Sequence, residues 1–229
     1  MARRARIVIP GWPHHVTQRG NHRQTVFFSD HDRIVCLDLM RRYFTIHELS
    51  LIGHSLMSNH VHFVIIPPTA EALSLGVGRL NQDYSRLQNM RCGRTGHLWQ
   101  NRFFSCPVQH DRVWEALAYV ELNPVRARLV EKASDWKWSS SRAHVSGIDE
   151  TGLLDMTLWQ QHFEGPAWNK FLEEAAKRKQ IQDAIRRATS TGSFWGSDET
   201  AERLERQLGR SIRGRPLRQP QANREKGLS

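Results

Sequence analysis

Residues 49–66 carry the pattern of a β-hairpin. Two β-rich runs are separated by the turn pair Ser58-Asn59, and a Pro-Pro pair ends the second run. Apolar residues at helical spacing lie on both sides of this segment. Antiparallel hairpins mixed with helices favour an α+β sandwich.

The rest of the first 122 residues alternates between strand-like and helix-like spacing. The sequence predicts strands at 14–21, 49–57, 60–66 and 102–108, and helices at 29–44, 70–91 and 114–122. The order β-α-β-β-α-β-α predicts an antiparallel sheet with helices packed mainly on one face, plus a helical C-terminal extension.

The basic charge of the chain lies at its two ends. The chain has 33 Lys and Arg against 23 Asp and Glu, a net charge of +10. Residues 1–24 contain five arginines and no acid, and residues 209–229 contain six basic residues and one acid. This distribution favours a polyanionic partner such as nucleic acid. Two solvated basic tails would give the same charge count.

Several classes of protein are disfavoured by composition. No stretch approaches the ~18 apolar residues of a membrane helix, and the basic N-terminus has too short an apolar run for a signal peptide. The three cysteines are odd in number and widely spaced, which disfavours a disulfide framework or a Cys-based zinc site. We expect a cytoplasmic, nucleoid-associated protein without membrane contact.

A His-Val-His sequence lies on the second strand of the hairpin. Side chains alternate along a strand, so His60 and His62 should point to one face about 7 Å apart, with Val61 on the other. A divalent cation could bind two such imidazoles. Two ordinary histidines near a strand end are the alternative interpretation.

The following helix supplies a tyrosine and an amide. Tyr84 and Gln88 share one helix face, and an amide oxygen can bind a hard cation. Tyr84 is also in register with Val77 and Leu80, as a core tyrosine would be. Together with the two histidines, this pair predicts a nucleophile–metal site, in which the phenol attacks a phosphodiester that the cation polarises.

Six motifs in order resemble those of the REP-associated tyrosine transposases, a branch of the HUH single-tyrosine (IS200-like) transposases. The motif MSNHVHFVI at 57–65 is similar to the hairpin motif of that family, although Ser58 replaces the proline of many relatives. The other five are RGNHRQTVFF (19–28), LNQDYSRLQN (80–89), GHLWQNRFFS (96–105), YVELNPVRARLV (119–130) and WKWSSSRAH (136–144).

The resemblance implies a ferredoxin-like sandwich and a metal-dependent DNA transposase or nickase. Such an enzyme cleaves and rejoins single-stranded DNA at palindromic, REP-like hairpins through a 5′-phosphotyrosine intermediate. Tyr84 would be the nucleophile, and His60, His62 and Gln88 would bind Mg²⁺ or Mn²⁺, with Asn89 as the competing third ligand. The family includes both monomers and domain-swapped homodimers, so the sequence leaves the oligomeric state open.

Two other functions remain open at this point. A nucleic-acid-binding regulator on the same fold would bind hairpins without cleaving them, and a metal-assisted hydrolase would use water in place of Tyr84. We expect a catalytic domain at 1–146, a helical extension at 147–208 and a basic tail at 209–229.

Polar and cationic residues outside the centre are candidates for DNA contact. One group follows the first strand, and a second lies in a segment that mixes an aromatic residue with amides. A third group follows Asn123-Pro124, and the last is an Arg-Gly-Arg segment suited to a narrow minor groove of DNA. The alternatives are a polar surface loop, a core tryptophan, surface ion pairs and a solvated tail. The candidates are Arg19, Asn21, His22, Arg23, His97, Trp99, Arg102, Arg126, Arg128, Arg213 and Arg215.

Overall fold

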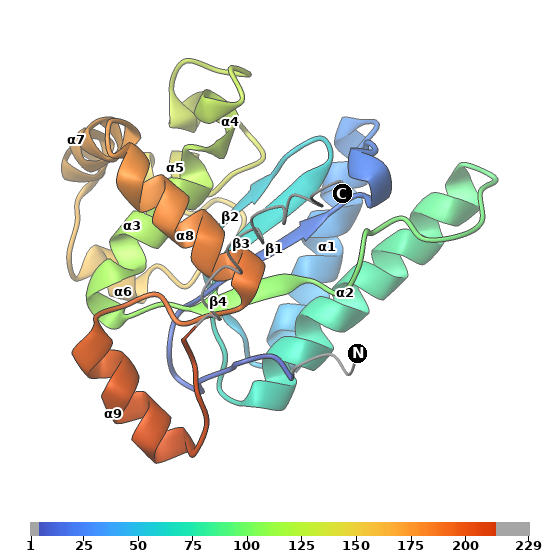
Figure 1. Ribbon diagram of the computed structural model, residues 1–229. Coiled ribbons are helices and arrows are strands. Elements are labelled where there is room, and N and C mark those ends of the chain that lie inside the picture. The colour runs from blue at the N-terminus through green and yellow to red at the C-terminus, as the bar shows by residue number, and fades with distance from the viewer. Residues whose placement is uncertain (1–4, 214–229) are drawn as a thin grey trace, which may run out of the picture.

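A four-stranded antiparallel sheet forms the centre of the protein in the computed structural model, which describes residues 5–213. The strand order is β2-β3-β1-β4 (Figure 1). The strands are β1 (His14–Arg19), β2 (Ser50–Leu56), β3 (His60–Ile66) and β4 (Phe104–Pro107). This order, with one helix after β1 and one after β3, confirms the predicted ferredoxin-like sandwich.

The helices follow the sequence expectation closely up to residue 122. The first three are α1 (Asp30–Ile46), α2 (Ala70–Arg91) and α3 (Val113–Glu121). The C-terminal part contains α4 (Asn123–Arg126), α5 (Ser141–Ser146), α6 (Thr157–Gln160), α7 (Gly165–Ala176), α8 (Lys179–Thr191) and α9 (Asp198–Leu208). Short 3-10 turns lie at Asn21–Arg23, His110–Arg112 and Ala133–Asp135.

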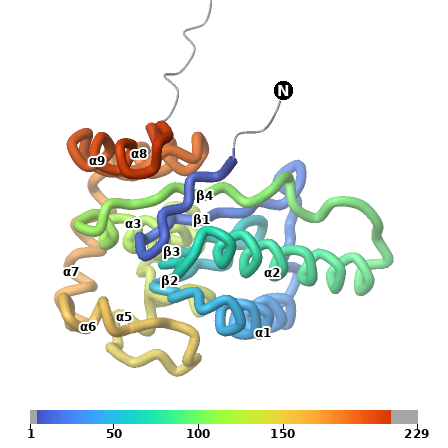
Figure 2. Tube along the Cα trace, turned by 90° about the horizontal axis from the view of Figure 1, so that it is seen from below, coloured from blue at the N-terminus to red at the C-terminus, as the bar shows by residue number. Residues whose placement is uncertain are grey.

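Helices α1 and α2 cover one face of the sheet (Figure 2). Alternate strand residues such as Val16, Val61 and Phe63 point to this face and pack with Leu80 of α2 and Met40 of α1. Each of these side chains is at most 1% exposed. Burial of apolar surface contributes about 25 cal/mol per Å², so this layer is a main source of stability.

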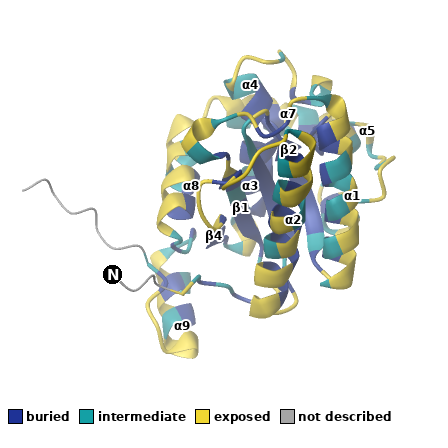
Figure 3. Ribbon diagram, turned by 90° about the vertical axis from the view of Figure 1, so that its right-hand side faces the viewer, coloured by how far each residue is buried: buried dark blue, intermediate teal, exposed yellow. Residues whose placement is uncertain are grey.

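The opposite face of the sheet is also covered, by α3 and the C-terminal helices. Ile52 of β2 and Val64 of β3 point to this side and pack in one cluster with Leu117 of α3 and Ile185 of α8. The strands β2 and β3 are therefore buried on both faces. In Figure 3 the strands are dark blue, for buried, while the outer faces of the helices around them are yellow, for exposed. The residues of the expected extension 147–208 thus share a core with the sheet.

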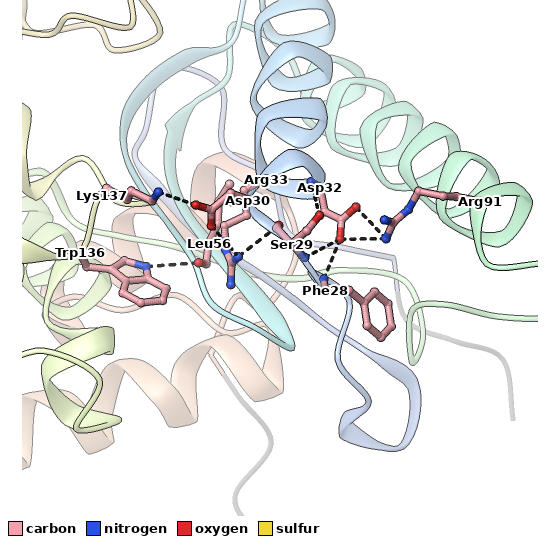
Figure 4. A network of polar contacts seen from close by, with 9 residues as sticks. All are labelled: Phe28, Ser29, Asp30, Asp32, Arg33, Leu56, Arg91, Trp136 and Lys137. Carbon is pink, nitrogen blue, oxygen red and sulfur yellow. Dashed lines mark hydrogen bonds and ion pairs between the residues drawn. The ribbon is translucent and has the colours of Figure 1, made fainter.

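The N-terminus of α1 is fixed by a polar network (Figure 4). Ser29 caps the helix, and the Asp32 carboxylate accepts from the backbone N–H groups of Phe28 and Ser29. Arg91, the last residue of α2, forms an ion pair with Asp32 at 2.8 Å. This network ties the start of α1 to the end of α2.

The two ends of the described chain pack together beside β4. Ile7 and Ile9 form a small cluster with Leu204 of α9 and Ile212. Trp195 is buried and forms a parallel bridge with Val108, directly after β4. No helix within residues 5–213 has the length and apolar composition to cross a bilayer.

Candidate functional site

A cavity of about 620 Å³ lies on the sheet face that α3 and α8 cover. Strand β1 contributes His15, Thr17 and Arg19 to its wall, and β3 contributes His60 and His62. These residues alternate with core residues along their strands, so the pleat alone brings them to one face. The other side of the cavity is formed by Tyr119, Asn123, Arg126, Arg186, Thr189 and Ser190.

The two histidines of the His-Val-His sequence lie side by side, on one face, as the alternation predicts. Their ring centroids are 5.0 Å apart and the ring planes are nearly perpendicular, at 83°. Nδ1 of His60 lies 2.6 Å from the side-chain oxygen of Asn59, and Nδ1 of His62 lies 2.9 Å from Nε2 of His15. Both Nδ1 atoms therefore bond to protein neighbours, which leaves the Nε2 atoms as the nitrogens for a ligand in the cavity.

Burial keeps these imidazoles neutral. It lowers the pKa of His60 to about 4, helped by the charge of Arg19, while a hydrogen bond with the Asn123 side chain acts in the opposite direction. Burial also holds the pKa of His62 well below its usual value, and that of His15 at about 3. Neutral imidazole is the form that binds a metal ion.

Asn123 adds an amide beside the histidine pair. Its side-chain NH₂ donates to the backbone carbonyls of Tyr119 and Val120, at 3.1 and 3.2 Å, so its oxygen is the polar atom left for His60 or a cation. Across residues 5–213, no three His, Cys, Asp or Glu side chains gather as a metal site. A cation here would therefore rely on two imidazoles and an amide oxygen, a donor set that suits a divalent cation.

Tyr119 lies at the end of α3, in the wall of this cavity. Its ring packs edge-on against His15 and His62, with centroids 5.3 and 5.8 Å away. Arg126 lies over the same ring, 4.2 Å from its centroid, and donates to the Tyr119 carbonyl at 2.7 Å. A phenol, two imidazoles and a guanidinium thus meet in one cavity.

The charge of the cavity wall is entirely positive. Arg19, Arg23, Arg126 and Arg186 line it, and no carboxylate does so among the described residues. Burial lowers the pKa of Arg126 to about 10, opposed by its hydrogen bond with Tyr119, so the guanidinium stays charged near neutral pH. Its Nη1 is buried and has no hydrogen-bond partner within the described chain. An anion such as a phosphate would supply that partner.

Tyr84 and Gln88, the expected nucleophile and third ligand, lie on the other face of the sheet. Tyr84 packs in the cluster that contains Val61 and Phe63, and its hydroxyl donates to the Val26 carbonyl at 2.7 Å. Gln88 donates to the Tyr84 hydroxyl at 2.9 Å and accepts from Arg91 at 3.0 Å. Both side chains therefore complete a structural network, and the structure does not bring either of them to His60 and His62.

Asn89, the alternative third ligand, lies on the same helix as Tyr84. Its side-chain NH₂ donates to the Gly96 carbonyl at 2.9 Å, and the contact is exposed. It does not line the cavity that contains the two histidines.

The residues expected to contact DNA are distributed over several places. Arg19, Arg23 and Arg126 line the histidine cavity. His97, Trp99 and Arg102 line a second cavity of about 740 Å³ beside α2, although Trp99 is only 8% exposed and donates to the Asn81 carbonyl. Trp99 is thus mainly a core residue. Asn21, His22 and Arg128 lie outside the walls of both cavities.

The Arg-Gly-Arg segment is only partly described. Arg213 forms ion pairs with Glu202 at 3.1 Å and Glu205 at 3.5 Å, so its charge is already matched within the protein. Arg215 lies outside the described residues, as does most of the expected tail 209–229.

The sequence contained a signal for Tyr119 and Asn123. They are four residues apart, like Tyr84 and Gln88, and therefore share a helix face in the same way. Tyr84 is in step with the apolar Leu80 of its own helix, which indicates a core position. A core position for Tyr84 would have favoured Tyr119 as the tyrosine of the site. No local pattern indicated Arg186 or Thr189, because α8 reaches the cavity through tertiary packing.

Comparison with known proteins identifies a family model and similar solved structures. A family model described as "Transposase IS200 like" matches residues 11–123. The structure of a REP-associated tyrosine transposase bound to a REP hairpin is similar with a TM-score of 0.53 and 16% identity, covering 69% of this chain and 96% of that chain. A candidate transposase from Deinococcus radiodurans R1 matches with a TM-score of 0.37 and 16% identity, over 56% of this chain and 92% of that chain. No curated protein matches the chain significantly.

The segment that matches the family model contains the whole sheet. Residues 11–123 include all four strands, the His-Val-His sequence and Tyr119. The sheet order and the similar solved structure confirm the fold that the six motifs predicted. Residues 11–123 of the chain thus match the IS200-like transposase family.

Proposed function

We propose that this protein is a metal-dependent transposase or nickase that cleaves and rejoins single-stranded DNA, with Tyr119 as the nucleophile in place of Tyr84. The observation that carries the proposal is that Tyr119, His60, His62 and Asn123 line one cavity whose only charged side chains in the described chain are arginines. A phenol beside an anion-binding wall suits attack on a phosphodiester.

His60, His62 and Asn123 would hold the cation. Two neutral imidazoles with their Nδ1 atoms bonded elsewhere, and an amide oxygen beside them, fit Mg²⁺ or Mn²⁺. The bound cation would polarise a non-bridging phosphate oxygen and orient the scissile bond.

In the covalent step, the Tyr119 oxygen attacks phosphorus. A P–O bond to Tyr119 forms and the P–O3′ bond of the DNA breaks; the phenol proton passes to water, and the 3′ oxygen leaves with a proton. The product is a 5′-phosphotyrosine ester and a free 3′ hydroxyl. One phosphoester replaces another, so the step is reversible and the reverse attack rejoins DNA. Arg126, over the Tyr119 ring, is placed to stabilise the negative charge of the transferred phosphate.

Single-stranded DNA flanking a hairpin is the substrate that the surface favours. Beyond the histidine cavity, the cavity beside α2 and a smaller one of about 310 Å³ are lined by Arg6 and Arg102 and by no carboxylate among the described residues. Gln100 belongs to the walls of both the histidine cavity and the one beside α2, and Phe104 links the histidine cavity to the smaller one. A backbone of phosphates could follow these arginines. The similar solved transposase binds a REP hairpin, which supports a palindromic hairpin as the partner.

A covalent-adduct assay tests the proposal. Labelled single-stranded hairpin DNA is incubated with the protein and Mg²⁺ or Mn²⁺, and adducts are separated on a denaturing gel. We expect an adduct with wild type and with Tyr84→Phe, and none with Tyr119→Phe, because Tyr119 is the only tyrosine among the described residues that line the cavity. Hairpin binding should be kept by Tyr119→Phe to within about threefold, or 0.6 kcal/mol.

Other results would identify the competing functions. Cleavage without any adduct, unaffected by Tyr119→Phe, would indicate hydrolysis by water. Hairpin binding by wild type with neither cleavage nor adduct would indicate a non-catalytic regulator. An adduct that is lost with folded Tyr84→Phe but kept with Tyr119→Phe would restore the original assignment of the nucleophile.

A further inference from the structure

A chain of hydrogen bonds connects helix α8 to His62. The Thr189 hydroxyl donates its single proton to the Ile185 carbonyl, at 2.8 Å, so the Cys106 thiol, 3.2 Å from the same oxygen, acts as a donor to it. Nδ1 of His15 lies 2.7 Å from the same hydroxyl oxygen. Because the hydroxyl proton is already used, His15 must carry its proton on Nδ1 and donate it to Thr189.

The proton position on His15 fixes that on His62. A neutral His15 with a proton on Nδ1 has a bare Nε2, which can only accept a hydrogen bond. Nδ1 of His62 lies 2.9 Å from this Nε2, and the two ring planes are within 7° of parallel. His62 must therefore carry its proton on Nδ1, and its own Nε2 keeps a lone pair. Both rings are buried, so bulk water does not compete for these bonds.

We propose that Thr189 and His15 are positioning residues that hold His62 in the tautomer required for cation binding. The inference rests on the proposed function, in which His62 is a metal ligand. It gives α8 a role in the site, although α8 lies outside the segment that matches the family model. Partners that fix the tautomer of a ligating histidine commonly tune metal affinity.

His60 has a similar but independent partner. The side-chain NH₂ of Asn59 donates to the Arg23 carbonyl at 3.1 Å, which directs its oxygen toward Nδ1 of His60. Nδ1 of His60 therefore donates to the Asn59 oxygen. Different elements therefore determine which nitrogen carries the proton: the hairpin turn for His60 and α8 for His62.

Loss of the Thr189 hydroxyl should allow the hydrogen bonds between Thr189, His15 and His62 to reverse their direction. Without an acceptor at Nδ1, His15 can carry its proton on Nε2 and donate it to Nδ1 of His62. His62 then carries its proton on Nε2, where a cation would have to displace it. Thr189→Val removes the hydroxyl and keeps the shape, whereas Thr189→Ser keeps the hydroxyl.

The experiment compares these two variants with Thr191→Val. Thr191 lies on the same helix, and its hydroxyl donates to the Arg187 carbonyl at 2.9 Å, outside the chain of bonds to His62. Long-range ¹H–¹⁵N NMR of the metal-free full-length protein, labelled on histidine, reports which ring nitrogen is protonated, and His62→Gln assigns the signal. Mn²⁺ titration measures cation affinity without DNA.

We expect His62 to be protonated at Nδ1 in wild type, Thr189→Ser and Thr191→Val. In Thr189→Val we expect mixed protonation and a roughly tenfold loss of Mn²⁺ affinity. Protonation of His62 at Nε2 in wild type would overturn the inference, even if no variant folds. Unchanged protonation and affinity in folded Thr189→Val would overturn it as well.

The adduct assay separates this inference from the proposed function. If wild type forms no adduct but His62 is protonated at Nδ1 and Thr189→Val shows the expected change, the function is refuted and the positioning role stands. If wild type forms the adduct but His62 is protonated at Nε2, only the positioning role fails.

Discussion

The Tyr84 hydroxyl stabilises the fold at the level of a single residue. It donates to the Val26 carbonyl and accepts from Gln88, and burial raises the pKa of the phenol, which keeps it neutral. Tyr84→Phe would leave two buried polar groups without a partner. We expect the free energy of unfolding to fall by about 1–3 kcal/mol, measured by urea denaturation.

Tyr43→Phe is the matched control for this prediction. The Tyr43 hydroxyl donates to Asp83 on the partly exposed side of α1, where water can replace the lost bond. Its removal should cost less than about 1 kcal/mol. Equal unfolding midpoints for Tyr84→Phe and wild type would contradict a structural role for Tyr84.

Buried histidines should make the protein less stable in acid. Burial lowers the pKa of both His14 and His54 to about 4, against about 6.5 in an unfolded chain. Neutral His14 donates from Nδ1 to the Trp12 carbonyl and accepts from the Ile9 N–H at Nε2, so it has no place for a second proton. The unfolded state therefore binds more protons between these pKa values.

The stability from these neutral imidazoles is fully present above about pH 6.5 and is lost as the pH falls through about 4. We expect a loss of at most about 1.4 kcal/mol per histidine for each pH unit within this window. Urea denaturation at a series of pH values measures it, and His14→Gln should show a weaker dependence than wild type. A free energy of unfolding that is constant from about pH 7 to about pH 4.5 would contradict the prediction.

Residue-scale geometry was predictable where it depends on the pleat alone. The alternation of a strand placed His60 and His62 together, because neighbours two apart always share a face. The choice between Tyr84 and Tyr119 was different, since each is followed by an amide at helical spacing. The register of Tyr84 with Leu80 indicates a core position for Tyr84, but which helix face points to the cavity depends on packing across the sheet.

At the scale of elements, the contact between β2 and α3 sets the position of Tyr119. A Cβ at Gly53 would lie 2.2 Å from Leu117 Cδ1 and 2.9 Å from Ser140 Oγ. Leu117 is fully buried, and Ser140 donates to Glu121 at 2.6 Å, so neither can move freely. Gly53 therefore permits α3 to approach the sheet.

We expect Gly53→Ala to lower the free energy of unfolding by about 1–3 kcal/mol, as overpacking of a core does. It should also reduce adduct formation, because α3 carries Tyr119 away from the histidines. Thermal unfolding and the adduct assay measure the two effects.

Gly78→Ala is the control. Nothing lies within 4 Å of its added Cβ, and the residue lies inside α2, so the substitution should raise the free energy of unfolding by about 0.5–1 kcal/mol. Wild-type stability and activity of Gly53→Ala would show that α3 is not held in this way.

Element types and their order were more predictable than their layers. The turn and proline signals around 49–66 and the apolar spacing of 70–91 correspond to β2, β3 and α2. The helices were expected mainly on one face, where α1 and α2 lie. The structure adds a layer on the other face, because Ile52 and Val64 make that face apolar too. A charged helical segment such as α8 gives little sign in sequence that its few buried residues cover a sheet.

For the whole molecule, the site is assembled from segments that lie far apart in the chain. Strand β1, strand β3, the end of α3 and helix α8 each contribute to one cavity. The order of strands places β1 and β3 side by side in the sheet. Their contribution follows from the ferredoxin-like topology, whereas that of α8 follows only from the tertiary packing of the C-terminal part.

The complete set of proposed catalytic groups comes from one copy of the chain. Tyr119, His60, His62 and Asn123 line the same cavity within one monomer. A domain-swapped dimer would instead combine the tyrosine of one copy with the histidines of the other. From this geometry we predict action in cis rather than in a domain-swapped homodimer, the alternative that the sequence left open.

Mixing two inactive variants tests action in cis. Tyr119→Phe lacks the nucleophile, and the double variant His60→Ala with His62→Ala lacks the imidazoles. We expect no adduct from their mixture, because neither copy has a complete cavity. Wild type mixed with either variant serves as the control and should form adduct in proportion to its own share. The adduct gel, with light scattering to measure mass in solution, reads out both mixtures. Adduct from the two inactive variants together would show that one copy attacks with a tyrosine that the other positions, and the cis arrangement would then be wrong.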